Sequence, residues 1–206
     1  MLSSSSSVRV SVRRADLPAR LRDETSDLHH AVELRMGLPE SVRSRGDYSR
    51  LLARLFAVHS AIETRLDAPS WSEEWRAIGL ELVDHQRASL LRDDLHNLGV
   101  SQIPPPALAP ELTTFGQALG CLYVVEGSAV GGRVLAPAIQ TILGRVPTAF
   151  LDGETRGHPH PWQATLTALR RFEDGHGDGD DVILGARITF RMFGHNVARS
   201  TWTTAA

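Results

Sequence analysis

The sequence of 206 residues contains no lysine, because all 22 of its basic residues are arginine. Any anion that the protein binds must therefore be held by guanidinium, hydroxyl, imidazole or backbone groups. The 24 acidic residues bring the formal net charge to −2. A nucleic-acid-binding protein normally has a basic excess gathered on one face, so the charge balance argues against a nucleic acid as partner.

Cysteine is nearly absent as well. Cys121 is the single cysteine, which excludes intramolecular disulfides and argues against a cysteine-based zinc or iron–sulfur site. A reducing compartment suits such a chain, and we expect a cytoplasmic protein. Uncharged apolar runs such as residues 120–125 are much shorter than the roughly 20 residues that a membrane helix needs, so we expect no membrane segment.

Residues 1–16 are rich in serine and arginine and lack the continuous apolar region of a secretory signal. We interpret them as a flexible N-terminal tail, with an organellar transit peptide as the alternative. Asp16 is suited to cap a helix that has Pro18 in its first turn. Residues 17–206 are then expected to form one domain, since a chain of this length can bury its apolar surface in a single core.

Apolar residues recur at intervals of three and four, and no stretch shows a convincing alternation with period two. The chain is therefore predicted to be all-α, with six to eight helices. The predicted helices cover residues 17–36, 47–62 or slightly beyond, 72–83, a short segment through Leu95, 114–144, 162–172 and 181–199. Gly37, Gly99 and Gly144 are expected to end three of them.

The most unusual part of the sequence is residues 123–135, which we call the glycine segment. Gly127, Gly131 and Gly132 lie within six residues, and each glycine inside a helix costs about 1 kcal/mol relative to alanine. Gly127 and Gly131 share one helix face, where another body could lie directly on the backbone. That body could be a neighbouring helix or a flat ligand, and adjacent glycines also permit a kink.

The first predicted helix carries a second group of polar residues. Arg22, Thr25, His29 and Glu33 follow one side of the helix. A neutral imidazole can bind a metal through one nitrogen while its other nitrogen is held by a carboxylate, and Glu33 is placed to do this directly or through water. A single helical histidine can equally be an ordinary packed or surface residue. Of the remaining histidines, we interpret His59 as a core residue and His85 as a surface residue.

Two stretches together resemble the heme oxygenase family, most closely its bacterial, bacteriophytochrome-associated branch. They are Thr25-Ser26-Asp27-Leu28-His29-His30-Ala31-Val32-Glu33 and Leu122-Tyr123-Val124-Val125-Glu126-Gly127-Ser128-Ala129-Val130-Gly131-Gly132-Arg133-Val134-Leu135. The first pattern alone is weak, and the Glu-Gly-Ser-x-x-Gly-Gly pattern is moderately specific. The likeness runs from about Arg20 to Trp202 and includes Ala186-Arg187-Ile188-Thr189-Phe190 near the end.

The resemblance implies a single-domain helical bundle with heme b held between the first helix and a kinked, glycine-rich distal helix. His29 matches the proximal iron ligand, with Thr25 and Glu33 as its neighbours. Gly127, Gly131 and Gly132 match the distal backbone, with Gly127, Gly131 and Ser128 at the catalytic side. Arg22 is the best candidate for the heme propionates, and Phe190 matches the phenylalanine of the last helix.

The resemblance also implies an activity. Heme oxygenases open heme with O2 and electrons to biliverdin, CO and ferrous iron. An external ferredoxin or reductase would supply the electrons, since the chain has no flavin or nicotinamide motif. A bacteriophytochrome would be the biliverdin acceptor. Many members carry an aspartate where this chain has Ser128, so a heme-binding or heme-transfer protein without turnover is the alternative.

Overall fold

The computed structural model describes residues 16–153 and 161–197, and these residues form helices and connecting loops without a β-strand. The all-α prediction is confirmed. The helices are α1 (Leu17–Met36), α2 (Arg45–Leu66), α3 (Ser72–Ala77), α4 (Ala88–Asn97), α5 (Phe115–Leu143), α6 (Ala149–Asp152), α7 (Pro161–Asp174) and α8 (Gly179–Asn196), with short 3₁₀ turns η1 (Pro69–Trp71) and η2 (Leu82–His85). Residues 1–15 of the predicted tail and the end of the chain after Val197 lie outside the described residues.

Local capping sets the ends of the long helices. The Asp16 carboxylate accepts a hydrogen bond from the Ala19 amide, and Gly37 ends α1 in the left-handed conformation with φ 56°. The Thr114 hydroxyl caps α5 in the same way by accepting from the Gln117 amide. α2 begins at Arg45, two residues earlier than predicted, because the Ser44 side chain serves as its cap.

The helix expected over residues 72–83 is wrong in its second half. α3 ends at Ala77, and Gly79 follows with φ 77°, a conformation that leaves the right-handed helix. The chain then turns through η2 before α4 begins at Ala88. The apolar residues Ile78 and Leu80 are nevertheless buried, so their spacing reported burial rather than a continuous helix.

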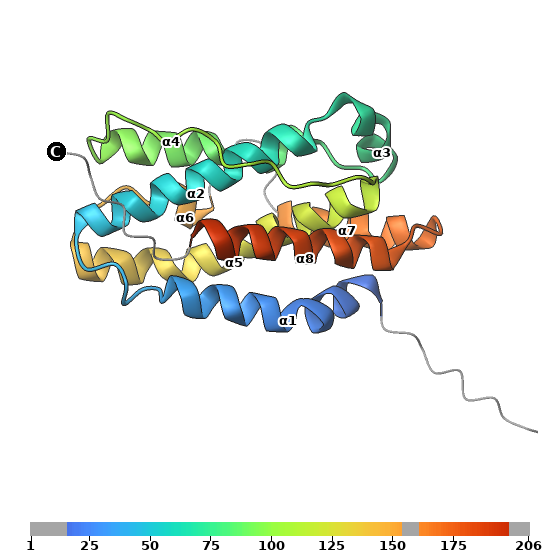
Figure 1. The fold of residues 1–206 in the computed structure, drawn as a ribbon, viewed down its shortest axis with the longest axis horizontal. Coiled ribbons are helices and arrows are strands. Elements are labelled where there is room, and N and C mark those ends of the chain that lie inside the picture. The colour runs from blue at the N-terminus through green and yellow to red at the C-terminus, as the bar shows by residue number, and fades with distance from the viewer. Residues whose placement is uncertain (1–15, 154–160, 198–206) are drawn as a thin grey trace, which may run out of the picture.

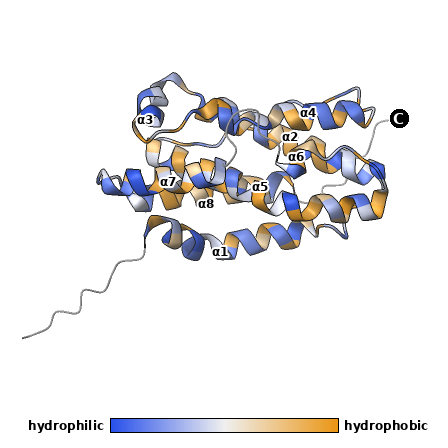
Figure 2. Ribbon diagram, turned by 180° about the vertical axis from the view of Figure 1, so that it is seen from behind, coloured by the Kyte–Doolittle hydropathy of each residue, from blue (hydrophilic) through white to orange (hydrophobic). Residues whose placement is uncertain are grey.

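The long helices α1, α5 and α8 run in the same direction, and α8 packs against both of the others (Figure 1). Contacts along α8 follow the order of the chain: Asp180 pairs with Arg20 at 2.5 Å, and Phe190 meets His29 further along. Helix α5 makes its most extensive contact with α8 and also packs against α2, α6 and α7. Figure 2 shows hydrophobic and hydrophilic residues intermingled along each long helix, as expected where one face is buried.

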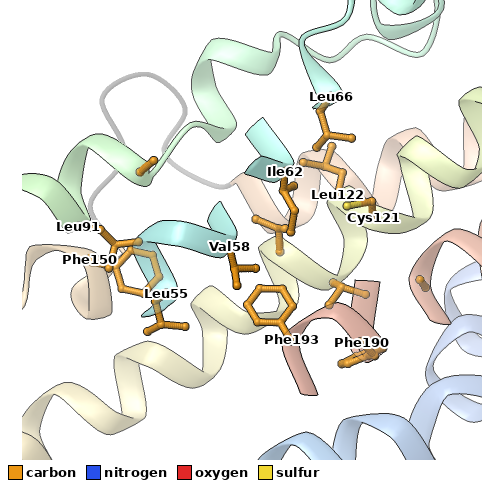
Figure 3. Close-up of a cluster of buried hydrophobic side chains, with 14 of the residues drawn as sticks. Leu55, Val58, Ile62, Leu66, Leu91, Cys121, Leu122, Phe150, Phe190 and Phe193 are labelled. Carbon is orange, nitrogen blue, oxygen red and sulfur yellow. The ribbon is translucent and has the colours of Figure 1, made fainter. Parts of the chain in front are cut away.

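The centre of the core lies between α2, α5 and α8 (Figure 3). Val58 and Ile62 of α2 face Leu122 of α5 and Phe193 of α8, and all four are at most 5% exposed. Helix α5 is long and apolar enough to span a membrane by length and composition. More than half of its most apolar stretch is buried inside the bundle, as for the core helix of a folded domain.

Glycines allow α5 and α8 to touch backbone to backbone. A Cβ atom on Gly120 would overlap the carbonyl of Val182 and lie 2.8 Å from the Ala186 amide nitrogen. A Cβ atom on Gly185 would likewise overlap the backbone of Gln117. Since backbone atoms cannot turn away as a side chain can, these two glycines fix the distance between the helices.

We predict that Gly120→Ala lowers the free energy of unfolding by about 3 kcal/mol, because α5 and α8 must move apart to admit the methyl group. Chemical denaturation followed by circular dichroism measures the change. Gly131→Ala is the matched control on the same helix, since no atom lies within 4 Å of its Cβ position. The control is expected to gain about 0.5–1 kcal/mol from improved helix propensity. Equal stability of the two variants would contradict the close contact.

Candidate functional site

The candidate site begins on the outer side of α1, where the side chains of Arg22, His29 and Glu33 are more than half exposed. The Nε2 atom of His29 lies 3.7 Å from Oε1 of Glu33, and Nδ1 of His30 lies 4.0 Å from the other carboxylate oxygen. Glu33 therefore stands between both histidines, whereas the sequence pattern assigned it to His29 alone. Thr25 differs from its predicted partners because it is buried and its hydroxyl donates to the Leu21 carbonyl at 2.7 Å.

Phe190 of α8 supports His29 from the core side. The two rings meet edge to face with centroids 5.7 Å apart and an interplanar angle of 81°. Phe190 is 8% exposed, so its ring is fixed by the packing around it. This contact limits the rotation of the imidazole and leaves its outer edge in solvent.

Helix α5 carries the glycine segment, and its position along the bundle relative to α1 follows from contacts with neighbouring helices. Burial raises the pKa of the Tyr123 phenol, and the charges of Arg22 and Asp23 also act on that pKa. Both helices run in the same direction and rise about 1.5 Å per residue. Ala186 of α8 lies against Gly120, and Phe190, one helical turn later on α8, meets His29. His29 therefore lies about one helical turn before Gly127 along the bundle.

The glycines of the glycine segment are not equivalent. A Cβ atom on Gly127 would lie 3.6 Å from the Trp162 ring, and one on Gly131 would meet no atom within 4 Å. A Cβ atom on Gly132 would lie 2.9 Å from the Leu151 carbonyl oxygen. Close packing against α6 therefore explains the glycine at position 132. No contact within the described part of the chain explains the glycine at position 131.

The surface beside Gly131 is apolar. Val130 is 46% exposed and Val134 is 76% exposed, one and three residues away on the same helix. A kink is expected from the sequence at the adjacent glycines. In the structure α5 is one continuous helix from Phe115 to Leu143, so the glycines do not interrupt it. An exposed glycine and two exposed valines on a core helix form a bare apolar strip that the described chain does not cover.

Ser128 uses its hydroxyl proton within its own helix. The Ser128 Oγ donates to the Val125 carbonyl at 2.6 Å, and its oxygen retains acceptor capacity. Two arginines of α7 and α8 donate to distant backbone carbonyls: Arg171 to that of Ile78 and Arg187 to that of Glu24. Arg22 contacts Asp23 at 3.7 Å at its own helix surface.

Within the described residues, no group of three or more histidine, cysteine, aspartate or glutamate side chains is arranged to hold a metal ion. A single imidazole is sufficient where the metal brings its remaining ligands with it, as iron does in a porphyrin.

A second polar group lies behind α5 and was not predicted from the sequence. His85 is 3% exposed, so its interpretation as a surface residue is wrong, and its Nδ1 lies 2.9 Å from Oε1 of the fully buried Glu126. Glu63 accepts from the amides of Arg87 and Ala88 at 2.7 and 2.8 Å. The sequence does contain one indication of this group: Glu126 is a carboxylate that directly follows two valines in an apolar helix.

Two further residues that the sequence did not point to lie at the glycine segment. The rings of Tyr123 and Trp162 contact each other with centroids 5.3 Å apart, and both stand at Gly127. Tyr123 could have been found one helical turn before Gly127. Trp162 could not, because α7 is remote in the sequence.

The chain was compared with known proteins by sequence and by structure. No protein-family model matches it. It is 31% identical over 112 residues to a curated protein of Xanthomonas campestris pv. campestris (strain 8004) named heme oxygenase. That alignment covers 52% of this chain and 65% of the relative, slightly less than two thirds of its length.

The fold is similar to that of the NO- and CO-bound heme oxygenase from Neisseria meningitidis. The TM-score is 0.70, the sequence identity is 24%, and the superposition covers 89% of this chain and 91% of that structure. The likeness confirms the predicted bundle architecture.

His59 is a second buried histidine, and its burial predicts how the stability of the protein depends on pH. Its side chain is 1% exposed, neither ring nitrogen has a hydrogen-bond partner among the described residues, and the ring packs between Phe150 and Phe193. Burial lowers its pKa to about 3, and the nearby Arg87 cation acts in the same direction. Below its ordinary pKa near 6.5 the unfolded chain takes up a proton that the folded protein does not. Stability is therefore full above about pH 6.5 and is lost as the pH falls.

We predict that this one group contributes a slope of about 1.4 kcal/mol per pH unit between about pH 6 and 4. His59→Leu should remove that slope from the pH dependence of the free energy of unfolding, measured by urea denaturation. Leu55→Ala is the control, because it shortens a buried α2 side chain without changing proton uptake. An unchanged slope in His59→Leu would show that His59 is protonated in the folded state.

Proposed function

We propose that this chain belongs to the heme oxygenase family, binds heme through His29 and opens it oxidatively. The observation that carries the proposal is the bare strip around Gly131 on α5, a helix that runs parallel to α1, which carries His29. Gly131 is a helix interior position without a side chain and without a packing partner within the described residues. A flat ligand between α1 and α5 would account for both features.

The residues present fit heme in chemical terms. His29 would offer one ring nitrogen to the iron while Glu33, whose Oε1 lies 3.7 Å from Nε2, holds the other ring nitrogen. The edge of Phe190 restricts the ring to the direction of the site. Gly127, Gly131 and the exposed valines receive the apolar face, and the Trp162 ring would form one edge of the pocket.

The cationic and polar ends of the site are assigned in the same way. Arg22 is 77% exposed at the side-chain level and lies about two helical turns before His29, so its planar guanidinium can hold a propionate by two hydrogen bonds. The Ser128 oxygen can accept a hydrogen bond from an ordered water, since its own proton is donated to Val125. Gly127 and Gly131 leave room for that water. Thr25 and Gly132 serve through the core packing of α1 and α5.

When bound, heme supplies an iron that reacts with O2, so that heme is at once cofactor and substrate, and the family's products are biliverdin, CO and ferrous iron. We infer that the electrons come from a separate ferredoxin- or reductase-type donor. A bacteriophytochrome as the acceptor of biliverdin rests on the resemblance alone, and a cytoplasmic location rests on the scarcity of cysteine.

A second candidate function is heme binding or transfer without turnover. The Ser128 hydroxyl favours it, because a hydroxyl whose proton is already donated to Val125 is a poorer proton source than a carboxylic acid. The same residues would bind heme in both cases. The two functions differ only in whether the bound heme is opened when electrons and O2 are supplied.

The experiment that tests the proposal is addition of hemin to the purified protein. We expect a sharp Soret band, its loss in His29→Ala, and its retention in His30→Ala, the matched variant of the neighbouring exposed histidine. Reduction in air should then produce bilin absorption. Hemin binding without bilin formation would leave the carrier function in place and contradict the oxygenase. Wild-type protein that gives no Soret band would contradict both.

The bare strip makes a separate prediction. Gly131→Ala should stabilise the protein without hemin, because its methyl group enters open space on a helix. The same methyl group would occupy the clearance over the ligand, so hemin affinity should fall by about tenfold or more. Denaturation and hemin titration measure the two changes. A variant that is more stable and binds hemin as tightly as the wild type would show that heme does not lie on Gly131.

A further inference from the structure

The buried pair of His85 and Glu126 lies on the side of α5 that faces away from the glycine strip. Glu126 is fully buried, and its neighbour in the sequence is Gly127. His85 belongs to η2, the turn before α4, and is 3% exposed. A cavity of about 10 Å³, room for one water molecule, lies beside the pair and is lined by Glu63, Leu66 and Leu122.

Apart from the close contact of Gly132 with the Leu151 backbone, the glycine segment has few means of holding its orientation. Its glycines reduce helix propensity, and Gly127 and Gly131 contribute no side chain to packing on the ligand side. The buried residues Val125 and Ala129 pack behind it, but apolar contacts tolerate a small rotation of the helix about its axis. A hydrogen bond between buried groups does not, because its geometry is directional.

Among hydrogen bonds between described residues, the bond of Glu126 to His85 is the one that ties a side chain of the glycine segment to another element. The Ser128 bond stays within α5. Arg87, next to η2, is 1% exposed and is attracted by the charges of Glu126 and Glu63. The pair is therefore part of a buried polar group that is costly to move.

We propose that His85 is a positioning residue, which holds the glycine segment in its rotation through Glu126 and so sets the bare strip over the heme. This inference rests on the proposed function for the identity of the ligand. His85 touches no part of the ligand site. Its effect passes through one carboxylate to the backbone of Gly127.

The test uses the difference between breaking a buried pair and replacing it. His85→Leu or Glu126→Met alone leaves one buried polar partner and should lower the unfolding midpoint. The double variant removes both polar groups and should regain most of the midpoint, since apolar side chains of similar volume pack in their place. A role in stability alone predicts that the double variant behaves like the wild type in every other respect.

Positioning predicts a different result for the double variant. Amide hydrogen exchange of residues 123–135, measured by mass spectrometry without hemin, should be faster than in the wild type although the midpoint is regained. The hemin dissociation constant should rise on the order of tenfold, with a shifted visible spectrum. Leu66→Ala is the control: it opens the same cavity from α2, lowers the midpoint, and should leave exchange at 123–135 and the hemin spectrum unchanged.

The outcomes are distinguishable. A stable double variant with wild-type exchange and a wild-type hemin spectrum would overturn the positioning role and leave the proposed function intact. A wild-type protein that binds no hemin would overturn the proposed function and this inference together. Faster exchange and an altered spectrum in Leu66→Ala, equal to those of the double variant, would overturn the positioning role by assigning the effect to the cavity rather than to the hydrogen bond.

Discussion

The contact between α5 and α8 is the constraint on which the remaining structure depends. Gly120 and Gly185 let the two backbones touch, and this brings Phe190 of α8 close enough to α1 to meet His29. Because α1, α5 and α8 run in the same direction, the contact also fixes the height of each helix relative to the others. The level of His29 relative to Gly127 follows from that register, through the contacts of α8 with both helices.

The glycines of α5 divide by what lies opposite them. Gly120 and Gly132 are required by protein backbone, from Val182 and Leu151 respectively, and would be glycine in a bundle without any ligand. Gly131 has open space at its Cβ position among the described residues and still costs the helix about 1 kcal/mol in propensity. This loss of helix propensity is not offset by any contact among the described residues, which is the physical reason to propose a ligand beside Gly131.

Much of the fold could be predicted from local sequence. Asp16, Gly37 and Thr114 mark helix ends through interactions within a few residues, and the structure has the ends where those residues stand. The polar face of α1 and the glycine spacing were also local signals. What could not be predicted depends on distant partners: Gly132 is explained by Leu151 of α6, and His85 is buried because Glu126 of α5 receives its ring. The periodicity over residues 72–83 reported burial correctly but could not show that Gly79 leaves the helix.

The absence of lysine acquires a structural meaning in the bundle. Several guanidinium groups donate to backbone carbonyls of distant segments: Arg45 to Arg145, Arg171 to Ile78 and Arg187 to Glu24. A fork of five donors can bond a carbonyl while it also pairs with a carboxylate, as Arg187 does with Asp27 at 3.8 Å, and an ammonium lacks that rigid geometry.

These arginines therefore join helices and loops. Arg22 is different, since its ion pair is with the adjacent Asp23 and its side chain is largely in solvent. Its fork of donors faces outward two turns from His29. That position suits a carboxylate that arrives with a ligand better than one supplied by the protein.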